Sequence, residues 1–111
     1  MTGSGDNMKY KLMNIQEAND GKHKLKATFY NMETGREKIF KFGAFGMNDY
    51  TIYYKISPKE ANERKRLYLL RHSGMGEDWK KISKGALSRW ILWNKPTIKE
   101  SIKDFIKRFK L

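Results

Sequence analysis

The fold is decided first by residues 22–30, KHKLKATFY, in which apolar and polar residues alternate. Leu25, Ala27 and Phe29 would point to one side of an extended chain, and the residues between them to the other. A period of two residues is typical of a β-strand with one buried face. We therefore expect a strand over residues 22–31 that carries a sheet core on one side and lysines on the other.

Two further strands are expected on either side of this one, over residues 9–18 and 36–42. The segments between them, Asn19-Asp20-Gly21 and Glu33-Thr34-Gly35, both end in glycine, which adopts positive φ readily. Strands joined by such short turns pair with their neighbours in sequence. The pattern predicts an antiparallel meander.

After residue 56 the apolar spacing becomes helical, and we expect three helices, over residues 58–72, 84–94 and 98–109. The first and the last follow capping signals, Ser57 and Thr97, each with a glutamate three residues later. In the last helix, isoleucines and phenylalanines recur at a spacing of three and four residues. We expect this apolar stripe to pack against the sheet.

A chain of 111 residues has the size of one domain. We expect residues 1–8 to form a flexible tail and residues 9–111 to form a single α+β domain. In this domain an N-terminal three-stranded antiparallel meander packs with three C-terminal helices. Residues 48–54 leave open whether a fourth short strand or an aromatic loop follows the meander.

Composition excludes several function classes. The chain has no cysteine, which rules out a disulfide scaffold, cysteine-bound metal and a thiol nucleophile. It has no apolar run long enough for a membrane span, and its first residues do not resemble a signal peptide. Its two histidines lack the spacing of a metal site. We therefore expect a non-enzymatic protein that is not secreted, with no cofactor, no metal and no small-molecule substrate.

Net charge is the strongest functional signal. The chain has 24 lysines and arginines against 12 acidic residues, a formal net charge of +12. Residues 57–111 alone contain 15 basic and 6 acidic residues. Such an excess lowers stability through self-repulsion, and solubility alone does not require it. We expect a polyanionic partner, with nucleic acid the leading candidate.

Basic and aromatic residues interleave in the same half of the chain. Lysine and arginine neutralise phosphates, and exposed aromatic rings stack on bases. We interpret Trp90 and Trp93 as core residues, so we expect contacts to backbone phosphates more than to bases. The candidate nucleic-acid-binding residues are Arg64, Lys65, Arg66, Arg71, Lys80, Lys81, Lys84, Arg89, Lys95, Lys99, Lys103 and Lys107.

Three alternatives stay open at this point. The helix over 98–109 has a basic face that also suits an anionic membrane surface or a partner protein. The glycines of residues 43–46 suit a phosphate-binding loop, although a tight turn at the end of a strand explains them as well. His72 with Glu77 and Asp78 resembles a phosphodiesterase site, although a histidine at a helix C-terminus also complements the helix dipole.

Five blocks of sequence resemble a known family. They are residues 42–51 (FGAFGMNDYT), 68–72 (YLLRH), 77–79 (EDW), 88–97 (SRWILWNKPT) and 101–102 (SI). Together they are similar to a family of small basic proteins encoded by large nucleocytoplasmic DNA viruses of protists and algae, mimivirus-like and chlorovirus-like genomes among them. No activity is assigned to that family, so the resemblance carries over no site residue.

The resemblance implies a context. Such viruses pack long genomes, and it implies a DNA-binding accessory or genome-packaging protein, located in the virion or inside the infected host cell. The alternative is a minor capsid-associated structural protein that contacts acidic virion proteins. The chain departs from the family pattern at Phe45 and at Tyr53-Tyr54, which makes its middle segment more apolar and favours a protein contact there.

Overall fold

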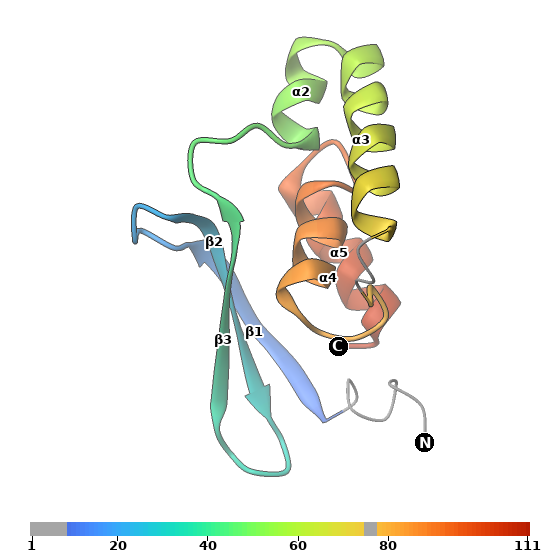
Figure 1. Cartoon of the computed structure of the whole chain (residues 1–111). Coiled ribbons are helices and arrows are strands. Elements are labelled where there is room, and N and C mark those ends of the chain that lie inside the picture. The colour runs from blue at the N-terminus through green and yellow to red at the C-terminus, as the bar shows by residue number, and fades with distance from the viewer. Residues whose placement is uncertain (1–8, 75–77) are drawn as a thin grey trace.

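Three antiparallel strands form a sheet in the computed structural model, which describes residues 9–74 and 78–111 (Figure 1). The strands are β1 (Tyr10–Glu17), β2 (His23–Asn31) and β3 (Glu37–Ala44). Each strand pairs with its neighbour in sequence, in the order β1-β2-β3. The predicted meander is confirmed, and the predicted tail over residues 1–8 lies outside the described residues.

Strand β1 contains an irregularity that the alternating pattern did not predict. Its pairing with β2 shifts between Leu12 and Asn14, so Met13 is an extra residue in the ladder. An extra residue reverses the side on which the following side chains point. Strict alternation along β1 would place Ile15 on the face opposite Leu12, but with the extra residue both side chains pack against the core.

Four α-helices and one π-helical turn follow the sheet in the described residues, against three predicted helices, and the predicted helix over residues 84–94 corresponds to α4 and the turn after it. They are α2 (Tyr50–Ile56), α3 (Pro58–Ser73), α4 (Lys84–Leu87), the π-helical turn η1 (Ser88–Leu92) and α5 (Ile98–Phe109). Within the described parts of the chain, none of these helices has the length and apolar character needed to cross a membrane.

Helix α2 corrects the prediction of a fourth strand or an aromatic loop over residues 48–54. Its aromatic and β-branched residues are typical of strands, but Asp49 caps a helix there. The Asp49 Oδ1 atom accepts hydrogen bonds from the backbone N–H groups of Thr51 at 2.9 Å and Ile52 at 3.3 Å. The helix is therefore set by its cap and by packing against α3, which overrides the local preference of its residues.

The caps predicted for the other helices are confirmed. Ser57 accepts a hydrogen bond from the Glu60 N–H, and Thr97 accepts one from the Glu100 N–H. Helix α3 ends at Ser73, so His72 lies in its last turn, as one of the two interpretations of this residue predicted.

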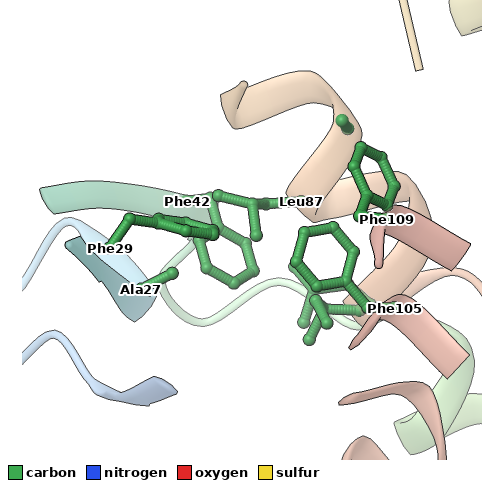
Figure 2. Packing of buried hydrophobic residues seen from close by; sticks show 9 residues of the cluster. Ala27, Phe29, Phe42, Leu87, Phe105 and Phe109 are labelled. Atoms are coloured by element: carbon green, nitrogen blue, oxygen red, sulfur yellow. The ribbon is translucent and has the colours of Figure 1, made fainter. Parts of the chain in front are cut away.

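The core lies between the sheet and the helices α4 and α5 (Figure 2). Phe29 of β2 and Phe105 of α5 have no solvent-exposed surface, and their rings meet edge to face at 6.4 Å. Leu87 of α4 fills the space beside them. In Figure 1 these helices lie on one side of the sheet, which confirms that the apolar stripe of the last helix packs against the strands.

Gly43 allows the end of β3 to approach the helices closely. Its φ is +77°, and a Cβ atom at this position would lie 2.6 Å from Leu92 Cδ1. Gly46 also has a positive φ, of +82°. These conformations confirm a tight turn at the end of the strand, which was one of the two interpretations of residues 43–46.

A stack of aromatic rings joins α3 to the segment after η1. The Trp93 ring lies 4.6 Å from Tyr68, nearly parallel to it, and Tyr68 stacks in turn on His72 at 4.2 Å. Tyr53 of α2 contacts Trp93 from the side. Trp90 and Trp93 are partly buried against the core, as predicted.

Candidate nucleic-acid interface

The twelve predicted basic residues divide according to their partners. Four of them have specific contacts within the described structure: Arg64, Lys65, Arg66 and Arg89. The others are exposed residues of α3, of the segment before α4, of α4 itself, of the loop after η1 and of α5. This division separates the candidates with contacts that stabilise the fold from the candidates on the exposed surface.

Arg64 and Arg66 are paired with acidic residues on their own helix. Arg64 donates to Glu60 at 3.0 Å and lies over the Tyr53 ring at 5.3 Å, while Arg66 donates two hydrogen bonds to Glu63. Pairs of this kind satisfy the arginine and cancel its charge locally. Neither residue is a strong phosphate ligand in this arrangement.

Lys65 is turned toward the interior. Its ammonium donates to the Asn94 carbonyl at 2.9 Å and lies 4.9 Å from the centre of the Tyr50 ring. Burial lowers the pKa of Lys65, and the nearby charges of Arg89 and Lys95 lower it further. These contacts tie α3 to the loop after η1, so we assign Lys65 a structural role.

Arg89 lies in the π-helical turn and is also partly buried. Its guanidinium donates to the Trp93 carbonyl at 2.7 Å and lies 4.1 Å from the centre of the Trp90 ring. Arg108 of α5 lies over the same ring at 3.8 Å, so two arginines contact Trp90. Burial lowers the pKa of Arg89, and its buried Nε atom has no hydrogen-bond partner among the described residues.

Seven of the predicted residues are exposed and have no ion pair within residues 9–74 and 78–111: Arg71, Lys81, Lys84, Lys95, Lys99, Lys103 and Lys107. The positive charges of these seven residues are therefore not neutralised by an ion pair in the described part of the fold. Lys80 is exposed as well.

Helix α5 arranges three of these lysines in a row. Lys99, Lys103 and Lys107 are four residues apart, which places them on one exposed face of the helix. Phe105 and Phe109, on the same helix, are buried against the core. The row is thus fixed to the domain by the packing of its own helix, and we call it the α5 lysine row.

Asp104 of α5, the neighbour of Lys103 in sequence, has partners outside the lysine row. Asp104 accepts hydrogen bonds from Asn94 at 2.7 Å and from Arg108 at 3.3 Å. Burial raises the pKa of Asp104, but these hydrogen bonds and the Arg108 and Lys95 charges outweigh it, and the pKa is lowered. Asp104 therefore stays ionised and belongs to the Asn94–Arg108 cluster.

A pocket of about 200 Å³ is lined by basic residues whose proximity was not predicted from the sequence. Its lining includes Lys84, which was predicted, together with Lys41, His23 and His72. We call it the histidine pocket, because it contains both histidines of the chain. Strand β2 contributes one histidine and the last turn of α3 the other, a proximity that no local sequence pattern indicates.

The phosphodiesterase site considered for His72 is only partly described by the structure. Glu77 lies outside the described residues, and Asp78 accepts a hydrogen bond from the Lys80 backbone N–H. Among the described residues, no three histidines, aspartates or glutamates form a group able to hold a metal ion.

Comparisons with protein-family models, with curated proteins and with solved structures found no match. The similarity to a viral family therefore remains a hypothesis from the sequence blocks. Function has to be argued from the positions of the charges and from the pockets.

Proposed function

We propose that this protein is a non-enzymatic, largely sequence-independent DNA-binding protein that serves a large DNA virus as an accessory or genome-packaging factor. It binds the phosphate backbone and resides in the virion or inside the infected cell. The viral setting comes from the sequence resemblance. The binding activity is argued from the charges.

The α5 lysine row is the observation that supports this proposal most directly. Its three cations are exposed, lie on one helix face and have no ion pair within the described residues. Lysines placed in this way neutralise phosphates and release counterions without reading base edges.

The aromatic residues support backbone binding over base stacking. Trp90 and Trp93 are partly buried against the core, and Tyr68 is buried. Rings held in this way do not offer free faces to unpaired bases. We therefore propose that single strands and duplexes bind through the same phosphate contacts.

A second function is favoured by a different observation. Phe45, Met47 and Ile56 are at least 62% exposed, and Phe45 and Met47 line a separate pocket of about 400 Å³. Exposed apolar residues gathered around a pocket are typical of protein contacts. The alternative is therefore a minor virion protein that binds a capsid-associated partner through this surface.

Filter binding of random-sequence duplex DNA, from low to physiological salt, tests the first proposal. We expect retention at low salt that falls steeply as salt rises. Absence of retention at every salt concentration would contradict it. Cross-linking mass spectrometry of virus particles separates the two functions, since links only to shell proteins, without nucleic-acid adducts, favour the second.

A further inference from the structure

The histidine pocket brings together side chains from four parts of the fold. It is lined by His23 of β2, Lys41 of β3, His72 of α3 and Lys84 of α4, with Tyr68 and Ser88 also on its wall. None of its described lining residues is acidic. Asp20, which is not part of the lining, lies 3.7 Å from the Lys41 ammonium and 2.8 Å from His23 Nδ1, so it offsets part of this charge, whereas Lys84 has no ion pair among the described residues. Like charges that converge repel one another, and a bound anion relieves that repulsion.

His23 is held in one orientation by Asp20. The His23 Nδ1 atom lies 2.8 Å from Asp20 Oδ2, and the Asp20 Oδ1 atom accepts the backbone N–H groups of His23 at 2.7 Å and Lys22 at 2.9 Å. Hydrogen bonds from the backbone and ring of His23 and from the backbone of Lys22 hold the pKa of Asp20 far below its usual range. An ionised carboxylate only accepts, so Nδ1 donates to Asp20, and Nε2 is the ring nitrogen left to contact a ligand. Nε2 donates to an anion when the ring is an imidazolium, in which both nitrogens carry protons.

His72 is fixed from the other side. Its ring stacks on Tyr68 at 4.2 Å, and Tyr68 stacks on Trp93. Two residues with restricted rings therefore face the same small space. Flexible lysine side chains, Lys41 and Lys84, complete the wall and can adjust to a bound group.

The size of the pocket limits what it can bind. Its volume of about 200 Å³ is below the roughly 300–1,000 Å³ of sites that hold drug-sized molecules. A whole nucleotide is too large, but a single tetrahedral phosphate group fits. Such a group presents several acceptor oxygens, which match the ammonium, imidazole and hydroxyl donors on the wall.

We propose that the histidine pocket binds one phosphate group, and that in the DNA complex this group belongs to the strand. The second half of this proposal rests on the proposed function. The pocket then acts as an anchor for one phosphate, while the α5 lysine row contributes weaker, exposed contacts.

The two histidines provide a direct readout. In a ¹H–¹⁵N spectrum of the imidazole groups of labelled protein, the only ring signals come from His23 and His72. We expect inorganic phosphate, added at constant ionic strength, to shift both sets of signals along one saturable curve. The Lys84→Gln variant should weaken this binding about tenfold, since hydrogen bonds to charged groups are individually strong.

Matched variants make the test specific. Lys84 is exposed and contributes nothing to the core, so its replacement should leave the fold intact. Lys99→Gln removes the same charge from α5 and should leave the phosphate titration unchanged. If both variants weaken phosphate binding equally, or if neither ring responds to phosphate, the pocket is not a phosphate site.

An oligonucleotide titration separates this inference from the proposed function. If phosphate and the oligonucleotide shift the same ring signals, the full proposal is supported. If the oligonucleotide binds but the ring signals stay unchanged, the anchor is refuted while the DNA-binding function stands. If phosphate shifts both rings and the oligonucleotide does not bind at all, the DNA-binding function fails and the pocket is a site for free phosphate.

Discussion

Replacement of the α5 lysine row by glutamine should change the salt dependence of DNA binding in a defined way. The row spans eight residues, from Lys99 to Lys107, which is about 12 Å at a rise of roughly 1.5 Å per residue. One DNA strand presents a phosphate about every 3.4 Å along its axis. The row is therefore long enough for each of its lysines to meet a different phosphate.

The expected magnitude follows from counterion release. Each neutralised phosphate contributes about −0.9 to the slope of log K against log salt concentration. Loss of three contacts should make the slope less negative by about 2.7. Between about 50 mM and about 200 mM salt, the wild-type protein should then lose about 40-fold more affinity than the triple variant does.

Fluorescence anisotropy with a labelled random-sequence duplex measures this slope. The matched control replaces Lys11, Lys22 and Arg36 by glutamine, because these residues are exposed in the sheet half of the chain and have no ion pair among residues 9–74 and 78–111. The control removes the same net charge as the α5 variant. Charges that do not contact DNA should contribute little to binding, because salt at 0.1 M largely screens charges separated by more than about 10 Å. If both triple variants change the slope equally, binding depends on net charge alone and the α5 interface is wrong.

Three further predictions concern stability. Phe105→Ala should lower the free energy of unfolding by about 3–5 kcal/mol in urea denaturation, because it leaves a cavity in a fully buried position. Asp49→Ala should lower the free energy of unfolding by about 3 kcal/mol. The change removes the α2 cap, and it also leaves the largely buried Lys24 ammonium without its carboxylate partner at 2.6 Å. A loss below about 1 kcal/mol would show that the cap alone contributes. Asp20 has a lowered pKa in the folded state, so its contribution is complete above its unfolded pKa of about 4 and is lost as pH falls below that value. Asp20→Asn should therefore flatten the stability profile between about pH 4 and about pH 2, and an unchanged profile would argue against the hydrogen bonds to His23.

The parts of the fold that the sequence predicted are those set by local rules. Strand β2 alternates strictly, and helices α3 and α5 begin at serine and threonine caps, so their periods and boundaries are visible in the chain. The segment of α2 was misassigned because its tyrosines and isoleucines prefer strands. Its cap, Asp49, gave a usable signal, since aspartate is one of the residues preferred at the N-cap of a helix.

The β1 bulge could not be read from the sequence. A one-residue insertion in a ladder leaves composition unchanged and shows only in the register with the neighbouring strand. The same limit applies to the histidine pocket. His23 and His72 line the same pocket only because of tertiary packing. The sheet packs on α4, and the stacking of Tyr68 on Trp93 positions α3 beside the pocket.

Charge counting predicts a polyanionic partner, but it does not indicate which cations already have contacts within the fold. Three of the four arginines proposed as ligands are held by contacts among the described residues. Arg64 and Arg66 are paired on α3, and Arg89 is stacked on Trp90. The planar guanidinium pairs with carboxylates and stacks on rings more readily than an ammonium does, so arginines near acidic or aromatic neighbours tend to be used internally.

Most of the candidate lysines are exposed on the surface, whereas three of the four candidate arginines are held by contacts within the fold. This difference affects the kind of nucleic-acid binding that is possible. The members of the α5 lysine row act as mobile point charges, which fits phosphate contacts that tolerate any sequence. Base-specific recognition in the major groove instead relies most often on arginine held in a two-pronged contact with guanine. With three of these arginines already engaged, the exposed positive charge of the helical half is largely lysine, and a protein built in this way should bind many sequences with similar affinity.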